Sequence, residues 1–211
     1  MNLADLRREY TKGGLRRADL DPNPLVQFQK WFEQALNAQL IEPSAMTVAT
    51  ADKNGPSARI VLLKALDERG FVFFTNYESR KGRELAENSN AALVFYWAEL
   101  ERQVCVAGGV SKVGRAESEK YFAMRPRGSQ LGACMSKQSS VVPDRAFLET
   151  RLQELEKHFA NRDVETPANW GGYVLAPNRI EFWQGRPNRL HDRFQYSKEP
   201  SGSWRIDRLS P

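Results

Sequence analysis

The sequence predicts an antiparallel β-barrel of the α+β class, with helices inserted between its strands. Apolar runs of strand length are separated by turn sequences such as DKNG and DERG, which favour β-hairpins. Helical periodicity is confined to a few isolated segments, so strands and helices do not alternate as they would in a parallel βαβ sheet. Hydrophobic residues make up 41% of the 211-residue chain, which suffices for a core and excludes disordered and fibrous proteins.

The chain begins with a basic arm and an amphipathic helix. Residues 1–20 show no apolar periodicity, and we expect this arm to lie over the surface of a single domain formed by residues 21–211. Asn23 and Pro24 are typical of an N-cap and of a first helical residue. Apolar side chains then recur at helical spacing, which predicts a helix over 24–39.

The rest of the chain consists mainly of predicted strands with helices between them. Strands are predicted over 45–51, 57–66, 71–76, 91–97, 102–116, 171–177, 179–185, 192–197 and 203–209. Helices are predicted over 78–88, 117–124 and 144–160. Gly108 and Gly109 are expected to bend the strand that contains them, and a Gly- and Ser-containing loop is expected from Arg125 through 141.

The charge balance points to an anionic ligand. Lys and Arg number 31 against 26 Asp and Glu, a formal net charge of +5, and 21 of the cations are Arg. The guanidinium group matches phosphate and carboxylate with two parallel hydrogen bonds. A solvated basic surface is the plain alternative. A nucleic-acid-binding face is another, although here the cations are spread over strands and loop ends instead of being interleaved with aromatic residues.

Several classes of protein and site are excluded or disfavoured. No apolar run reaches the roughly 18 residues of a membrane span, and the first residues lack the apolar stretch of a secretory signal. We therefore expect a cytoplasmic protein. Cys105 and Cys134 lie far apart and the two histidines share no motif, so no disulfide framework or metal site is expected. Common nucleotide and hydrolase motifs are also absent.

Two groups of cations lie on or beside apolar strands. Arg59 and Lys64 bracket four aliphatic residues, and a charge on such a strand is costly unless an opposite charge meets it or the strand end reaches water. Arg80 and Lys81 fall in the first turn of a predicted helix, where cations oppose the helix dipole. Because free N–H groups at a helix start attract anions, these residues suggest a phosphate site.

The segment 121–140 carries a second set of groups suited to a phosphate. It contains hydroxyl, amide and cationic side chains within a Gly-containing stretch: Tyr121, Arg125, Arg127, Ser129, Lys137, Gln138, Ser139 and Ser140. An ordinary polar loop is the alternative interpretation.

The segment 181–194 combines an aromatic residue with closely spaced cations. Trp183 could lie against a planar ring, and Arg189, His191 and Arg193 alternate along an extended segment. Between two arginines, the charged form of His191 should be disfavoured, which leaves a neutral hydrogen-bond acceptor near physiological pH. A core or surface histidine is the alternative. Together, these four groups of residues suggest two binding sites for anions around one slot lined by aromatic residues.

The motifs LRREYTKGGL, RIVLLK, SRKGRE, YFAMRPRGSQLG, SKQSS, EFWQG, RLHDRF and RIDRLSP resemble the pyridoxine/pyridoxamine 5′-phosphate oxidase family. The resemblance covers nearly the whole chain, from about Leu6 to Pro211. It implies a homodimeric split β-barrel with peripheral helices that binds FMN at the subunit interface. It also implies oxidation of pyridoxine or pyridoxamine 5′-phosphate to pyridoxal 5′-phosphate in vitamin B6 metabolism, with O₂ as acceptor and H₂O₂ as product.

The resemblance also implies roles for individual residues. The FMN contacts fall on Arg59, Ile60, Val61, Leu62, Leu63, Lys64, Phe74, Thr75, Arg80, Lys81, Gln103, Gln138, Ser139, Trp183 and Arg193. The substrate contacts fall on Arg7, Arg8, Glu9, Tyr10, Lys64, Tyr121, Arg125, Ser129, Arg189, Leu190 and His191. Arg189 and His191 are the expected catalytic residues, which would orient the substrate and help its C4′ substituent to lose a proton.

Two positions depart from the family pattern. Cys134 stands where a larger apolar residue is expected, and Phe74 stands where tyrosine is also common, but neither change removes a charged contact. A split-barrel flavoprotein that acts on another substrate remains the main alternative. A second, product-binding site is left open, with Arg16, Arg17 and Arg208 as the residues to test.

Overall fold

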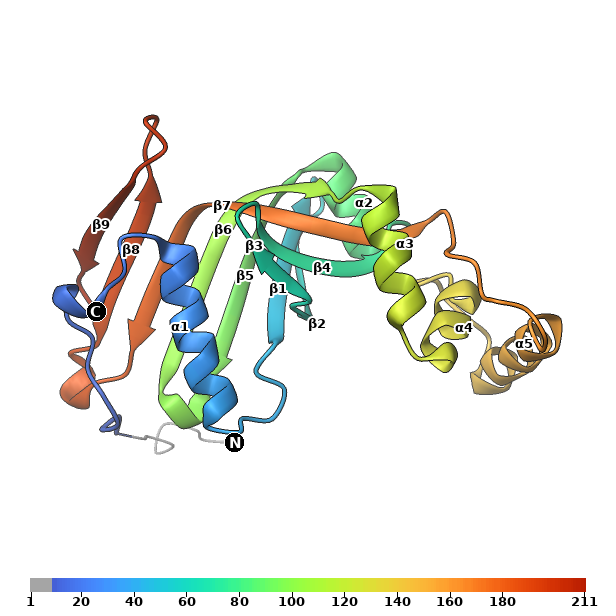
Figure 1. Ribbon diagram of the computed structural model, residues 1–211, viewed down its shortest axis with the longest axis horizontal. Helices are drawn as coiled ribbons and strands as arrows, with labels where there is room; N and C mark the ends of the chain where they lie inside the picture. The colour runs from blue at the N-terminus through green and yellow to red at the C-terminus, as the bar shows by residue number, and fades with distance from the viewer. Residues whose placement is uncertain (1–8) are drawn as a thin grey trace.

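The computed structural model describes residues 9–211, which form one antiparallel sheet with helices around it (Figure 1). The strands are β1 (Ala45–Asp52), β2 (Gly55–Leu62), β3 (Ala65–Asp67), β4 (Gly70–Asn76), β5 (Asn90–Trp97), β6 (Arg102–Lys112), β7 (Trp170–Gln184), β8 (Asp192–Lys198) and β9 (Trp204–Leu209). Their order is β2-β1-β5-β6-β7-β4-β3, and β8 pairs with β7 and β9 with β8. This arrangement confirms the predicted α+β class and the antiparallel barrel.

Strand β7 is the branch point of the sheet, because three other strands pair with it. It pairs with β6 along most of its length, with β4 over residues 170–175 and with β8 over residues 179–184. The sequence predicted two strands here, which was wrong. On β6, Ala107 pairs with Arg179 and its neighbour Gly108 pairs with Pro177, which leaves Asn178 of β7 unpaired as a β-bulge. Because the bulge accommodates this extra residue, the chain stays extended past Pro177.

The predicted strand over 57–66 is also divided. β2 ends at Leu62 and β3 begins at Ala65, and the backbone N–H of Lys64 donates to the carbonyl of Val72 at 2.8 Å. Leu63, which was expected to contact FMN, is instead buried in the core with 9% of its surface exposed. The break therefore turns Leu63 into the core and leaves Lys64 exposed at the edge of the barrel.

The helices are α1 (Pro24–Asn37), α2 (Arg80–Glu87), α3 (Arg115–Met124), α4 (Arg127–Met135) and α5 (Arg145–His158), with short 3-10 turns at Arg17–Asp19, Ala98–Leu100 and Pro187–Arg189. The predicted start of α1 is confirmed, since the Asn23 side chain accepts from the Leu25 N–H at 2.9 Å. Helix α4 was predicted to be loop, and that prediction was wrong. The two glycines of this segment, which have low helix propensity, suggested a loop. In the fold, however, Leu131 is buried with 3% of its surface exposed, and the free energy gained by this burial outweighs the cost of the glycines.

The main core lies between α1 and the sheet. The Phe28 ring is 4.8 Å from Phe95 and 4.9 Å from Phe71, and the Trp31 ring is 5.2 Å from Phe182. A buried aromatic side chain of this kind contributes about 1.5–3 kcal/mol through removal of apolar surface from water. The apolar face of α1 is thereby fixed across β4, β5 and β7.

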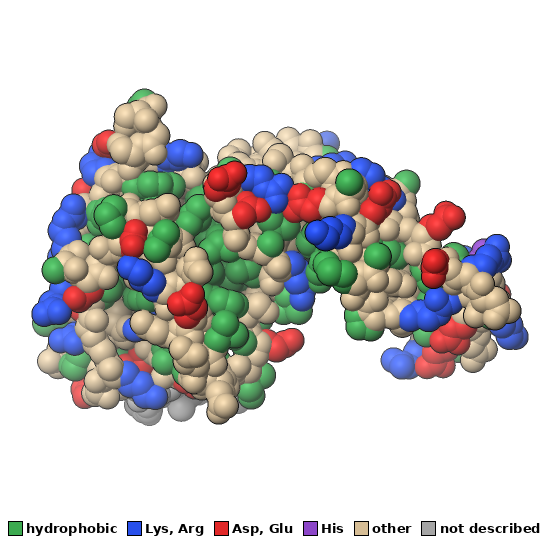
Figure 2. Space-filling model, in the orientation of Figure 1, with side chains coloured by type: hydrophobic (Ala, Val, Ile, Leu, Met, Phe, Trp, Pro, Cys, Tyr) green, Lys and Arg blue, Asp and Glu red, His purple; other side chains and the backbone are tan. Residues whose placement is uncertain are grey.

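A second apolar cluster holds the remaining helices. Phe122, Leu131, Val164 and Trp170 are buried together, which packs α3 and α4 against the start of β7. Helix α5 packs on α4 and forms the far end of a lobe that projects from the sheet (Figure 1). The space-filling view shows the molecule arched, with a hollow between the sheet and this lobe (Figure 2). Among residues 9–211, no helix combines the length and apolar character needed to cross a membrane.

The described part of the basic arm is attached to the barrel at the far end from the lobe. The backbone N–H of Leu15 donates to Asp192 at 3.0 Å and that of Lys12 to Glu101 at 2.9 Å. Leu15 is buried with 4% of its surface exposed, so the arm contributes to the core, which its composition did not predict. Arg7 and Arg8 lie outside the described residues.

The bulge between β6 and β7 gives a test of the fold. A Cβ on Gly108 would lie 2.0 Å from the carbonyl oxygen of Ala176, whereas a Cβ on Gly109 would have no atom within 4 Å. We expect Gly108→Ala to lower the free energy of unfolding by about 1–3 kcal/mol and Tm by roughly 2–12 °C. Thermal unfolding of Gly108→Ala beside Gly109→Ala checks this, and equal Tm values for the two variants would contradict it.

Candidate functional site

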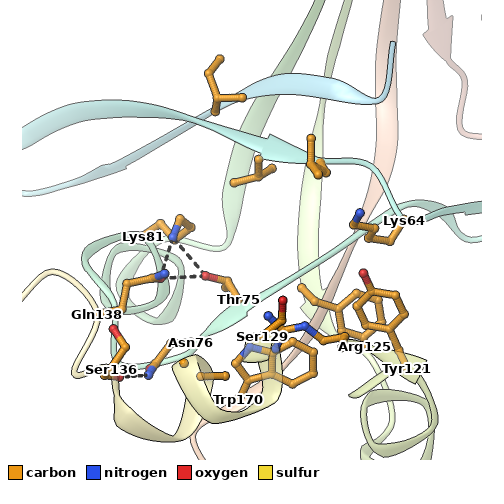
Figure 3. A pocket seen from close by; sticks show the side chains of 16 residues that line it. Lys64, Thr75, Asn76, Lys81, Tyr121, Arg125, Ser129, Ser136, Gln138 and Trp170 are labelled. Carbon is orange, nitrogen blue, oxygen red and sulfur yellow. Dashed lines mark hydrogen bonds between the residues drawn. The ribbon is translucent and has the colours of Figure 1, made fainter. Parts of the chain in front are cut away.

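A pocket of about 520 Å³ lies between the β2–β3 break, β4, α3 and α4, a size suited to a small organic ligand. The following sequence-predicted residues line it: Ile60, Val61, Leu62, Lys64, Phe74, Thr75, Lys81, Tyr121, Arg125, Ser129 and Gln138. Figure 3 shows that the polar side chains gather at two separate ends of the pocket. The two ends contain most of the residues that the sequence suggested for two anion-binding sites, which remain a prediction.

The first polar end is built around a buried lysine. Lys81 is 8% exposed, and its Nζ donates to Thr75 Oγ1 at 3.0 Å and to Gln138 Oε1 at 2.9 Å (Figure 3). Burial, followed by the charge of Arg59, lowers the pKa of Lys81 to about 8, although Glu84 acts in the opposite direction. Since both hydrogen-bond partners are neutral, an anion at this end would stabilise the lysine cation.

The start of α2 adds further donors beside Lys81. Ser79 caps the helix, accepting from the Gly82 N–H at 3.2 Å, and the backbone N–H of Arg80 donates to Ser139 Oγ at 3.2 Å. The structure therefore brings together Arg80, Lys81, Gln138 and Ser139, which are far apart in sequence. A helix start with two cations is suited to a phosphate group.

The second polar end contains an arginine that lacks one partner. Arg125 Nη1 is buried and makes no hydrogen bond to any residue in the described range 9–211, and the guanidinium group lies 4.8 Å from the Trp170 ring centre. Burial lowers the pKa of Arg125. Lys64, Tyr121 and Ser129 line the same end (Figure 3). An unsatisfied buried donor is costly, so this end is also suited to an anion.

Aromatic rings and aliphatic side chains form the apolar part of the pocket lining. Tyr121 stacks on Phe74 with ring centres 4.0 Å apart, and Phe74 stacks on Trp170 at 5.5 Å. The β2 residues 60–62 form the facing wall, where Ile60 remains 65% exposed. A planar ring system fits such a surface better than a globular ligand does.

A second cluster of predicted site residues lies at the other end of β7. The Trp183 ring lies 4.7 Å from His191 and 5.5 Å from Tyr10, and Tyr10 lies 5.7 Å from His191. Trp170 and Trp183 are on the same strand, and an extended strand of that length spans roughly 40 Å. The structure therefore does not bring this cluster to the pocket within one chain.

Three of the predicted FMN contacts form one row in this second cluster. Gln103 pairs with Trp183 across β6 and β7, and Trp183 pairs with Arg193 across β7 and β8. Directly paired residues project from the same face of a sheet. Arg193 is held by Glu181, with Nε 2.7 Å from the carboxylate.

The turn before β8 presents Arg189 and His191. Asn188 and Arg189 both have left-handed backbone angles, with φ of 55° and 60°, a conformation that costs non-glycine residues about 1–3 kcal/mol. Leu190 is 69% exposed. Strained turns of this kind concentrate at ligand-binding sites, which supports a functional role for Arg189.

The expected effect of the arginines on His191 is confirmed. Burial, then Arg189 and Arg193, lower the pKa of His191. However, the backbone N–H of Arg186 donates to His191 Nδ1 at 3.1 Å. The acceptor nitrogen is therefore used within the chain, and the neutral ring carries its proton on Nε2 as a donor.

Sequence reasoning missed several residues of the site and misplaced others. Asn76, Gly132, Ala133, Ser136 and Trp170 line the pocket but were not predicted. Asn76 directly follows Thr75 at the end of a strand, which was the available signal. Arg59 is not among the residues that line the pocket, but its charge acts on Lys81 at the first polar end, and its guanidinium pairs with the buried Glu84 of α2. Glu9 is exposed.

The three arginines named above as the residues to test for a second, product-binding site all have partners within the chain. Arg16 pairs with Asp19, Arg17 donates to the carbonyl of Ile206, and Arg208 pairs with Asp192 at 2.8 Å. Within the described part of the chain, His, Cys, Asp and Glu side chains form no group of three suited to a metal ion.

Comparison with known proteins identifies the family. Residues 32–159 match the family described as pyridoxamine 5′-phosphate oxidase, and residues 170–211 match the pyridoxine 5′-phosphate oxidase C-terminal dimerisation region. The chain belongs to the pyridoxine/pyridoxamine 5′-phosphate oxidase family. It is 58% identical to members with that name from Nostoc sp. and Burkholderia mallei, over 99% of this chain and 98% and 99% of theirs.

Solved structures of the oxidase family share the fold. PhzG from Burkholderia lata, in complex with tetrahydrophenazine-1-carboxylic acid, is 31% identical with a TM-score of 0.87, covering 92% of this chain and 95% of its own. A related FMN-binding protein from Nostoc punctiforme has a TM-score of 0.73 at 14% identity, covering 91% and 100%. FMN, the cofactor that the resemblance implies, has a planar ring system and a phosphate, and the aromatic lining and the cationic Lys81 end of the pocket fit these two parts.

The state of His191 can be measured directly. We expect ¹H–¹⁵N NMR to show a neutral ring protonated on Nε2 at pH 7 and a pKa below the usual 6.5. Arg189→Gln should raise that pKa because it removes a nearby positive charge, whereas Arg179→Gln on the exposed part of β7 should leave it unchanged. A pKa of His191 at or above 6.5 would contradict the assignment.

Proposed function

We propose that this protein oxidises pyridoxine 5′-phosphate and pyridoxamine 5′-phosphate to pyridoxal 5′-phosphate, with FMN as redox cofactor and O₂ as final acceptor. The alcohol and O₂ give the aldehyde and H₂O₂, and the amine, O₂ and water give the aldehyde, NH₃ and H₂O₂. The observation that carries the proposal is one slot with two cationic ends, since both FMN and the substrate carry a phosphate. Each phosphate monoester has a charge of about −1.5 to −2 near neutral pH.

The Lys81 end is the proposed site of the FMN phosphate. Lys81 and Arg80 supply positive charge there, and Ser139 and the start of α2 supply neutral donors. Thr75 and Gln138 hold the lysine in position. The flavin ring would then extend along the wall formed by residues 60–62, with backbone contacts from β2 and from Phe74.

The Arg125 end is the proposed site of the substrate phosphate. Arg125 offers the buried Nη1 that lacks a partner, and Lys64, Tyr121 and Ser129 lie beside it. A charge-assisted hydrogen bond to phosphate would satisfy that nitrogen. Two anchored phosphates fix the relative position of the two reacting rings, and such positioning accounts for a large share of many rate enhancements.

A second copy of the chain is proposed to complete each site. The dimerisation region matched over residues 170–211 contains Trp183, Arg189, His191 and Arg193, which lie far from the pocket of their own chain. A symmetric dimer places the same surface of both copies in contact, so each copy can supply this cluster to the pocket of the other. Tyr10 would accompany the cluster and cover the substrate.

The chain's own contribution to the chemistry is orientation and charge stabilisation. FMN, when bound, accepts the hydride from substrate C4′. Arg189 and the Nε2–H of His191 are proposed to orient the substrate, and as donors they stabilise negative charge on the C4′ oxygen while the proton of its hydroxyl passes to solvent water. His191 therefore acts as a donor at that nitrogen and does not take the proton there.

The similarity to PhzG keeps a different flavin-dependent oxidation as the alternative function. The ligand in that structure, tetrahydrophenazine-1-carboxylic acid, is described by its name as a carboxylic acid without a phosphate. An enzyme for such a ligand would not need Arg125 and Lys64 to hold a phosphate. Discrimination between phosphorylated and unphosphorylated substrates therefore separates the two functions.

Purified protein should be yellow with FMN and should produce H₂O₂ from pyridoxine 5′-phosphate but not efficiently from pyridoxine. We expect Arg125→Met to raise KM by about 10- to 100-fold, because loss of a charged hydrogen bond costs about 1.5–3 kcal/mol. Arg189→Met and His191→Asn should lower kcat/KM by at least about tenfold, the loss of one such donor. Peroxide-coupled kinetics measure both, with Arg179→Gln as control.

Wild-type kcat/KM in the Arg189→Met and His191→Asn variants would overturn their assigned roles. Equal turnover of pyridoxine and pyridoxine 5′-phosphate would overturn the proposed substrate class.

A further inference from the structure

We propose that Glu84 is a positioning residue that holds Arg59 and Arg80 in place for the phosphate of FMN. Glu84 lies on α2, one turn after Arg80, and has no contact with the pocket itself. Its role was not apparent from the sequence, where it is one of many glutamates. The inference rests on the proposed placement of the FMN phosphate at the Lys81 end.

The carboxylate of Glu84 is buried and accepts hydrogen bonds from three elements. The residue is 2% exposed. Oε1 accepts from Arg80 Nε at 2.8 Å and from Ser57 Oγ at 2.7 Å, whereas Oε2 accepts from Arg59 Nη2 at 3.2 Å and from the Thr50 hydroxyl. Glu84 thereby ties the start of α2 to β1 and β2.

The hydrogen-bond donors around Glu84 keep its carboxylate ionised. Burial by itself would raise the pKa of Glu84, but the donors Ser57, Thr50, Arg80 and Arg59 outweigh it and lower the pKa to about 2. Glu84 is therefore ionised at any physiological pH. A buried charge that accepts this many hydrogen bonds is held rigidly, which makes it a fixed reference point for both arginines.

The two arginines bound to Glu84 differ in how many of their N–H groups are free. Arg59 uses Nη1 for Val48 O and Thr50 and Nη2 for Ser57 and Glu84, so its guanidinium cannot turn freely. Arg80 is bound through Nε alone, and among the described residues its two terminal amino groups make no hydrogen bond. The side chain is 61% exposed, so both terminal amino groups of Arg80 can donate hydrogen bonds to a phosphate.

The net positive charge of the assembled group balances the negative charge of its proposed ligand. Arg59, Arg80 and Lys81 contribute three positive charges and Glu84 one negative charge, which leaves a net charge of +2. A phosphate monoester carries about −1.5 to −2 at neutral pH. Without Glu84, three cations would lie together in the free protein with no anion among them.

Substitution of Glu84 by glutamine separates positioning from simple charge attraction. The amide places an NH₂ group where one carboxylate oxygen had been, so it faces the donors on that side and releases one of the two arginines. If positioning dominates, Glu84→Gln weakens FMN binding. If net charge dominates, the added positive charge strengthens it.

The experiment measures Kd for FMN and for riboflavin, which lacks the phosphate, by flavin fluorescence. We expect Glu84→Gln to raise the Kd for FMN by about 10- to 100-fold, the range typical of residues that orient ligand-binding groups, and to leave the Kd for riboflavin unchanged. Glu87→Gln, an exposed glutamate on the same helix, is the matched control and should change neither value.

A second variant keeps the proposal testable if Glu84→Gln folds poorly. Ser57→Ala removes one donor to Glu84 and should raise the Kd for FMN alone by about 3- to 10-fold, the value of one hydrogen bond. In folded Glu84→Gln protein, the loss of the negative charge that raises the pKa of Lys81 should also move the alkaline fall in FMN affinity from about pH 8 to lower pH.

Unchanged or tighter FMN binding in both variants would overturn the role of Glu84, as would an equal loss of FMN and riboflavin. Failure of the wild-type protein to prefer FMN over riboflavin would instead overturn the placement of the phosphate.

Discussion

The length and stiffness of strand β7 constrain everything else in this molecule. Its 15 residues carry Trp170, which lines the pocket, near one end and Trp183, which belongs to the second cluster, near the other. Because β7 pairs with β6, β4 and β8, it cannot fold back to join the two groups. Under the proposed function, these two groups are half-sites that work only when two copies of the chain combine.

The second determinant is the set of buried cations that lack anionic partners in the pocket. Within residues 9–211, the hydrogen-bond partners of Lys81 in the pocket are neutral, and one buried nitrogen of Arg125 has no partner. Folding carries the cost of burying these groups, and under the proposed function the binding of a phosphate removes that cost. On that proposal, the excess of arginine over lysine in the sequence reflects two small phosphates instead of a long polyanion such as nucleic acid.

The sequence predicted the barrel class, the start of α1 and most of the groups at both ends of the pocket, because hairpin turns, caps and cations on apolar strands are local patterns. It failed where tertiary packing decides. Helix α4 forms because Leu131 is buried, and β7 passes Pro177 because a bulge absorbs one residue. Leu63 turned into the core at a strand break that no local pattern marks.

Glu84 and the tautomer of His191 were beyond sequence reasoning for the same reason. Each depends on a contact between residues of different elements or on a backbone N–H, as between Glu84 and Arg59 or between Arg186 and His191. Such contacts are fixed only when the chain has folded.

Mixed dimers test most directly whether each site is shared between two chains. A hybrid of an Arg125→Met chain and an Arg189→Met chain, purified by two different tags, should regain about half of the wild-type kcat/KM per dimer, because one of its two sites is intact. A hybrid of wild-type chain with the Arg125→Met, Arg189→Met double variant should retain about a tenth of the wild-type kcat/KM or less, because both of its sites are damaged. The opposite pattern, with the half-value of kcat/KM only in the second hybrid, would show that each site lies within one chain and would contradict the account.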